Sequence, residues 1–77
     1  ILIIPKIEIP TVRELKGNEH SKLLGEMYDA ANQTAEKEGI AEEGFRLIFN
    51  CGPNGGQEVY HIHMHLLGGR KMNWPPG

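Results

Sequence analysis

Three histidines, His61, His63 and His65, stand two positions apart near the end of this 77-residue chain, and an apolar residue follows each of them. Successive side chains of a β-strand point to opposite faces, so a strand over residues 59–67 would place all three imidazoles on one face. The opposite face of that strand is expected to carry four apolar side chains toward the core: Tyr60, Ile62, Met64 and Leu66. Imidazoles have no packing advantage over Val or Ile in a core, so the row predicts a chemical role.

The rest of the chain predicts an α+β fold in which one long helix packs on an antiparallel sheet. The continuous apolar run at residues 1–4 is typical of a strand that is covered on both faces. Residues 19–38 predict a helix that Asn18 caps and Gly39 ends. One face of this helix carries an apolar stripe that is expected to pack on the sheet: Leu24, Met27, Tyr28, Ala31 and Ala35. Residues 45–50 predict a strand that forms a hairpin with the histidine strand across a long loop.

Two smaller features are expected near the start of the long helix. Thr11, with Glu14 three residues later, has the spacing of a capping box and predicts one helical turn that Gly17 ends. His20 lies among charged and polar neighbours, so it is expected to be a solvated surface histidine.

Composition argues against several function classes. Eight Lys and Arg residues against ten Asp and Glu give a net charge of −2, whereas a nucleic-acid-binding protein needs a basic surface. No apolar run approaches the roughly 20 residues of a membrane span, so no membrane partner is expected. The single cysteine, Cys51, cannot form an internal disulfide, which favours a reducing, cytoplasmic setting.

Glycines at positions 52, 55 and 56 dominate the connection that precedes the histidines. Such a backbone can aim several N–H groups at one point and bind an anion, phosphate above all. An anion site beside imidazoles suits phosphoryl or nucleotidyl transfer, with one histidine as nucleophile and another as proton donor or phosphate clamp. Three imidazoles could equally hold a zinc ion with an open position, as in hydrolytic zinc sites. The spacing alone favours neither chemistry over the other.

The histidine row and its flanks resemble a known family. His-x-His-x-His followed by two apolar residues is similar to the signature of the histidine triad (HIT) superfamily. Residues 55–70 and 72–77 resemble its nucleoside phosphoramidase branch, the histidine triad nucleotide-binding proteins, and residues 1–6 are similar to a strand of that branch. The likeness extends over essentially the whole chain. It therefore implies that residues 1–77 form a single HIT domain, a HIT-like antiparallel sheet with one long helix packed on it.

This resemblance implies a purine nucleoside phosphoramidate hydrolase. Such an enzyme cleaves a P–N bond and releases a nucleoside monophosphate through a covalent nucleotidyl-histidine intermediate. The middle histidine, His63, takes the role of nucleophile, while His61 supports it and His65 contacts the phosphate. Further residues match positions that contact the nucleotide in the family: Asn50, Gly56, Gln57, Glu58 and Trp74. The family needs no cofactor and no metal, so the resemblance weighs against zinc.

The resemblance also implies a homodimer that forms through the long helix and a neighbouring strand, with Trp74 reaching the site of the partner. AMP-like purine nucleotides and phosphoramidates are the expected ligands. The family domain has a further N-terminal segment that supplies much of the nucleobase pocket, so residues 1–77 would correspond to its C-terminal two-thirds. The alternatives to the phosphoramidase are a nucleotide-binding regulatory or scaffold module with little turnover, and a zinc-dependent hydrolase.

Overall fold

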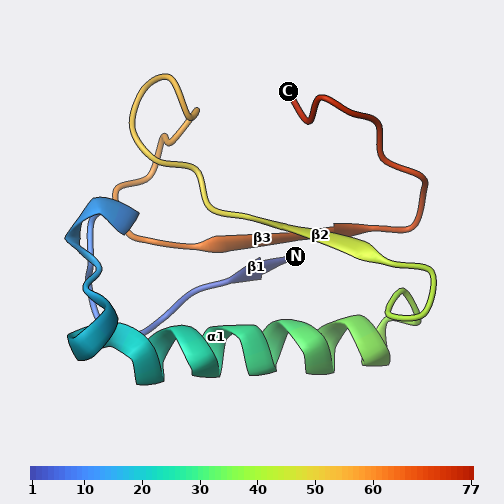
Figure 1. Ribbon diagram of the computed structural model, residues 1–77, viewed down its shortest axis with the longest axis horizontal. Coiled ribbons are helices and arrows are strands. Elements are labelled where there is room, and N and C mark those ends of the chain that lie inside the picture. Colours follow the sequence, from blue (N-terminus) through green and yellow to red (C-terminus); the bar gives the residue numbers. More distant parts are fainter.

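The computed structural model describes residues 1–77 and has two layers, a helix and an antiparallel sheet (Figure 1). The sheet has the strand order β1-β3-β2, where β1 is Leu2–Ile3, β2 is Phe45–Ile48 and β3 is Met64–Gly68. Both pairs of neighbouring strands are antiparallel. The helix α1, Gly17–Lys37, runs along one face of this sheet (Figure 1). The predicted α+β fold, with one long helix on an antiparallel sheet, is confirmed.

The core lies between α1 and the sheet. Its centre consists of Met27 and Ala31 from the helix and Met64 from β3, all buried. Four partly buried apolar side chains pack around this centre: Ile3, Leu23, Leu47 and Phe49. Ala35 is also buried, but Tyr28 of the predicted apolar stripe is nearly half-exposed. The stripe therefore packs on the sheet as expected along its middle and leaves one edge in solvent.

The predicted hairpin is confirmed, because β2 pairs with β3 in antiparallel register and Ile48 lies opposite His65. The regular strand begins only at Met64, so the expected strand over residues 59–67 is too long at its start. Tyr60 was expected in the core, and this prediction is wrong: its side chain is 54% exposed. The reason is that the chain bends before His61, outside the ladder, so strand alternation does not extend back to Tyr60.

The expectation that residues 1–4 are covered on both faces is wrong. Only Leu2–Ile3 form the strand β1, and β1 is an edge strand that pairs with β3 alone. Ile3 is half-buried against the helix-side core, whereas Leu2 and Ile4 are at least half-exposed. An apolar run predicts burial but does not reveal how many layers cover a sheet.

The start of the helix differs from the prediction in two residues. The capping box of Thr11 and Glu14 is confirmed at a short 3-10 helix, Val12–Glu14, and the Thr11 hydroxyl holds the pKa of the Glu14 carboxyl below its usual range. Gly17 does not end that turn but begins α1, and Asn18 lies inside the first turn instead of capping it.

The Lys16 N–H donates to Nδ1 of His20 at 2.9 Å, so this ring satisfies a backbone group at the helix start. His20 is partly exposed, and its ring has a capping role that the sequence did not indicate.

The end of α1 follows the sequence prediction. Gly39 adopts a φ of 74°, the left-handed conformation that glycine tolerates best. The next N–H, of Ile40, donates back to the Ala35 carbonyl at 3.0 Å and so closes the last turn. None of the helices combines the length and the apolar character that crossing a membrane requires.

Candidate functional site

The three histidines share the face of the sheet that points away from α1. Each of them is half-buried, and the residues between and after them, Ile62, Met64 and Leu66, are fully buried on the helix side. His65 is the only one within β3, and it lies between Leu2 of β1 and Ile48 of β2 in the ladder. The predicted alternation therefore holds across the whole row, although only its last histidine belongs to the regular strand.

The ring of His63 is fixed by its own chain. Nδ1 of His63 lies 2.8 Å from the carbonyl oxygen of His61. A carbonyl can only accept, so Nδ1 carries the proton and donates. In the neutral ring, the other nitrogen, Nε2, then holds the lone pair. A nitrogen with a lone pair and a fixed orientation is what a nucleophile requires.

His61 is held in turn by the N-terminal part of the chain. Its Nε2 lies 2.9 Å from the carbonyl oxygen of Pro5, and it donates there by the same argument. Two backbone carbonyls therefore orient the two rings. The Pro5 carbonyl accepts from the His61 ring, and the His61 carbonyl accepts from the His63 ring. His61 acts on its neighbour through the placement of its backbone and has no ring nitrogen hydrogen-bonded to His63.

His65 contributes a polar atom that has no partner within the protein. Its ring lies edge-on to that of His63, with the ring centres 5.0 Å apart and the planes at 65°. Nε2 of His65 is buried and makes no hydrogen bond. A buried polar atom without a partner is costly, so such an atom beside a candidate nucleophile is suited to meet a ligand.

The glycine-rich loop is wound tightly on itself. Gly52 and Gly56 have φ values of 71° and 78°, which a side chain would disfavour. The Gly56 N–H donates to the Pro53 carbonyl at 3.1 Å, and the Gln57 N–H donates to the Gly52 carbonyl at 3.0 Å. A Cβ atom at Gly55 would lie 2.4 Å from the carbonyl oxygen of Cys51. The glycines at these positions are thus required by backbone conformation and by close approach.

The other predicted site residues lie in different environments. Asn50 is half-buried just beyond β2, and the β2–β3 register continued by two residues beyond Ile48 leads to Asn50 opposite His63. Gln57 is buried and its side-chain amide bonds only to backbone groups of this chain. Glu58 is exposed, and Trp74 in the tail is 82% exposed. The continued register thus indicates that Asn50 lies beside the histidine run, without a hydrogen bond to it, whereas Trp74 lies exposed on the tail.

Comparison with known proteins decides the family. Residues 1–72 match the HIT domain. The chain belongs to the HIT family. It is 61% identical over 72 residues to the purine nucleoside phosphoramidase of Escherichia coli K12, covering 94% of this chain and 60% of that protein. It is 51% identical over 78 residues to a 14 kDa zinc-binding protein of Zea mays, covering 100% of this chain and 60% of that protein. The HIT chain thus spans about 60% of the length of the curated relatives that it matches.

The fold of this HIT chain also agrees with solved structures. A HIT family hydrolase from Legionella pneumophila superposes with a TM-score of 0.94 at 53% sequence identity, covering 99% of this chain and 67% of that chain. A HIT family hydrolase from Clostridium thermocellum gives a TM-score of 0.87 at 50% identity, over 94% of this chain and 62% of that one. These values confirm the HIT-like fold that the histidine row and its flanks predict.

Metal ligands do not converge in this HIT chain. No group of three or more His, Cys, Asp or Glu side chains is arranged to hold a metal ion. One ring nitrogen of His61 and one of His63 donate to backbone carbonyls, which leaves the other nitrogen of each ring without a partner in the chain. The histidine row as folded nevertheless lacks the converging ligands that a zinc site requires.

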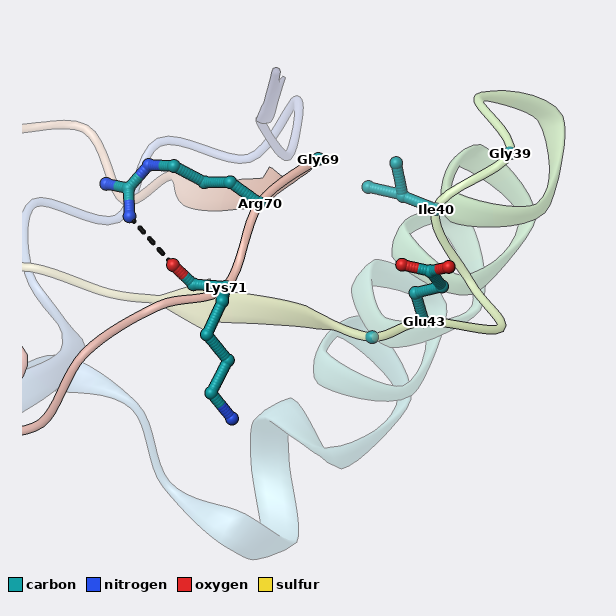
Figure 2. A pocket seen from close by; sticks show the side chains of 7 residues that line it. Gly39, Ile40, Glu43, Gly69, Arg70 and Lys71 are labelled. Carbon is teal, nitrogen blue, oxygen red and sulfur yellow. Dashed lines mark hydrogen bonds between the residues drawn. The ribbon is translucent and has the colours of Figure 1, made fainter.

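A hollow of about 340 Å³ lies beyond the end of β3, away from the histidines (Figure 2). Its wall includes the turn after α1, with Ile40 and Glu43, and the residues that follow β3, with Arg70 and Lys71. Figure 2 shows that both cationic side chains extend away from Ile40 and Glu43, and Arg70 donates to the Lys71 carbonyl at 3.0 Å. The two positive charges do not converge in this hollow, so it lacks the character of an anion site.

Proposed function

We propose that this HIT chain takes part in the hydrolysis of purine nucleoside phosphoramidates, with His63 as the nucleophile. The observation that carries the proposal is the hydrogen bond from Nδ1 of His63 to the His61 carbonyl. In the neutral ring this bond leaves the lone pair on Nε2 and fixes the orientation of the ring. The substrate class is supported by the 61% identity to the purine nucleoside phosphoramidase of Escherichia coli.

In the first step, the lone pair of Nε2 of His63 attacks the α-phosphorus and the P–N bond breaks. The amine leaves and takes up one proton from water, and the nucleotide becomes bonded to His63. The ring now carries a positive charge, which strengthens the bond from its Nδ1–H to the His61 carbonyl. The carbonyl thus stabilises the ring more after attack than before it, which favours the step.

In the second step, water attacks the phosphorus and displaces the imidazole. The water loses one proton, which balances the proton that the amine gained, so the net reaction adds one water across the P–N bond. His63 returns to its starting state with Nδ1 still protonated. The products are a nucleoside monophosphate and a free amine.

The phosphate site in this proposal surrounds Nε2 of His63. His65 donates from Nε2 to a phosphate oxygen, which would satisfy the buried atom that has no partner within the protein. Asn50 contributes its side-chain amide from the end of β2. Of the predicted loop residues, Glu58 contributes its backbone N–H, because the N–H groups of Gly56 and Gln57 already donate within the loop. The Gln57 amide side chain is also engaged, and the Glu58 carboxylate carries the wrong charge for a phosphate.

Substitution of Gly55 by alanine is expected to distort the phosphate loop. The new Cβ would lie 2.4 Å from the Cys51 carbonyl oxygen, so the backbone must shift. We expect a loss of about 1–3 kcal/mol in the free energy of unfolding and a clearly weaker affinity for AMP. Thermal unfolding and calorimetry with AMP measure the two effects. Gly25→Ala is the matched control, because that helix position is open and alanine there should stabilise the protein slightly. Unchanged AMP affinity in Gly55→Ala would contradict the loop assignment.

The experiment that tests the function is a turnover assay with an adenosine phosphoramidate, run beside calorimetry with AMP. Steady release of AMP and amine is expected. Tight AMP binding without turnover would instead assign the chain to a nucleotide-binding regulatory or scaffold module, the main alternative.

A zinc-dependent hydrolase is the second alternative, because two relatives bear the name of a zinc-binding protein. The three imidazoles do not converge as the ligands of a shared ion. We therefore expect turnover to survive exhaustive treatment with a chelator, followed by metal analysis. Loss of turnover that added zinc restores would favour the zinc alternative.

We also propose that the chain forms a homodimer. Only nine of 77 residues are buried, which is a small core for a stable domain, and several large apolar side chains are exposed. Trp74, 82% exposed on the tail, would then reach the site of the partner. Sedimentation at micromolar concentration is expected to give the mass of two chains. A monomer under these conditions would contradict the dimer.

A further inference from the structure

The segment at residues 5–10, between Pro5 and Pro10, holds the run that leads into the histidines. It has no regular secondary structure, yet three of its carbonyls accept hydrogen bonds from that run. Pro5 accepts from the His61 ring at 2.9 Å, and Ile9 accepts from the Ile62 N–H at 2.7 Å. Pro10 accepts from Nε2 of Gln57 at 2.8 Å. Because β3 begins only at Met64, no strand ladder fixes the backbone at His61 and His63. The hydrogen bonds to residues 5–10 fix it instead.

Gln57 is the one side chain that joins this segment to the glycine-rich loop. It is only 6% exposed. Its Oε1 accepts from the Gly52 N–H at 3.0 Å, and its Nε2 donates both to Pro10 and to the Val59 carbonyl at 3.1 Å. Both N–H donors and the carbonyl oxygen of the amide are therefore used within the protein. No N–H donor of this buried side chain is left for a phosphate.

We infer that Gln57 is a positioning residue, which sets the glycine-rich loop and the histidine run against residues 5–10 without touching substrate. The inference rests on the proposed function for its catalytic consequence. The family resemblance places Gln57 in the loop around the phosphate, and the structure adds that its side chain acts through other groups. A tie between loop and nucleophile matters because a displacement of about 1 Å between reacting groups can cost 100-fold in rate.

Two substitutions separate the hydrogen bond of Gln57 to the glycine-rich loop from its hydrogen bond to residues 5–10. Gln57→Glu keeps an oxygen for the Gly52 N–H but places the second oxygen against the carbonyls of Pro10 and Val59, which removes the anchor to residues 5–10. Gln57→Met keeps the length of the side chain and removes all three hydrogen bonds. Gln33→Glu and Gln33→Met are the matched controls, since Gln33 is exposed on α1.

The measurements are kcat and KM with an adenosine phosphoramidate, and the ring nitrogen NMR signals of His61 and His63 in the whole 77-residue chain. In Gln57→Glu we expect kcat to fall by about 10–100-fold with a much smaller change in KM, because the loop stays tied. In Gln57→Met we expect kcat to fall and KM to rise. In both variants the fraction of His63 rings protonated on Nδ1 should fall. The Gln33 controls should behave as wild type.

Other results overturn the inference. Ring signals and kcat like those of wild type in folded Gln57→Glu would show that the residue only supports stability. If neither variant folds, Gln57 determines the fold and not the geometry of the site. Absence of turnover in the wild type would contradict the proposed function alone, and the NMR signals would then judge Gln57 without any substrate.

Discussion

The His63→Ala variant is expected to lose at least about 1,000-fold in turnover of an adenosine phosphoramidate while still binding AMP. The substitution removes the only ring whose Nε2 is both unprotonated and fixed by a backbone carbonyl. His65, Asn50 and the glycine-rich loop remain, so the phosphate contacts that we propose remain with them. The loss should therefore appear in kcat, with the Kd for AMP measured by calorimetry close to that of the wild type.

His20→Ala is the control for the removal of an imidazole outside the site. That ring accepts from the Lys16 N–H at the start of α1, so its loss should lower the melting temperature slightly and leave turnover unchanged. Near-normal turnover in His63→Ala would transfer the nucleophile to another residue. Loss of AMP binding together with turnover would show instead that the ring is needed to hold the phosphate.

Met64→Ala is expected to destabilise the fold severely. Met64 is fully buried at the centre of the core, packed against Met27 and Ala31 of the helix. Truncation of a buried methionine costs about 2–5 kcal/mol, and folded domains of this size have only a few kcal/mol in reserve. In a domain this small each kcal/mol shifts the melting temperature by about 4–8 °C, so we expect a drop of roughly 10 °C or more.

Leu67→Ala on the same strand is the control, because that side chain is 40% exposed. Thermal unfolding followed by circular dichroism should separate the two variants clearly. Met64→Ala should lose both activity and secondary structure. His63→Ala should lose activity but keep its secondary structure. Equal melting temperatures for Met64→Ala and Leu67→Ala would show that the helix does not pack on β3 as described.

Local sequence patterns predicted much of the fold because they report on local physics. The period of two around the histidines predicts the buried set Ile62, Met64 and Leu66, and Gly39 marks the end of the helix through its left-handed backbone. The predictions failed where residues far away in the sequence determine whether a strand is buried or where the chain bends. The apolar run at residues 1–4 does not show that one face of its strand stays open, and nothing near Tyr60 shows that the chain bends there.

The sequence predicted which side chains form the site. The orientation of these side chains, however, depends largely on hydrogen bonds to backbone carbonyls. The carbonyl of Pro5, 56 residues before His61, orients that ring, and no pattern of residue types announces such a contact. The Gln57 side chain is likewise buried by a partner far away, the Pro10 carbonyl, 47 residues earlier in the chain. Long-range hydrogen bonds to irregular backbone leave no periodic trace in a sequence, so only the structure reveals them.

The most direct test of the proposed nucleophile is NMR of the protein labelled with ¹⁵N on its histidines and trapped during incubation with an adenosine phosphoramidate. We predict a nucleotide bonded to Nε2 of His63, seen as coupling between that nitrogen and phosphorus, with Nδ1 still protonated toward the His61 carbonyl. A nucleotide on Nδ1 of His63, or on either ring of His61 or His65, would contradict the assignment of the nucleophile.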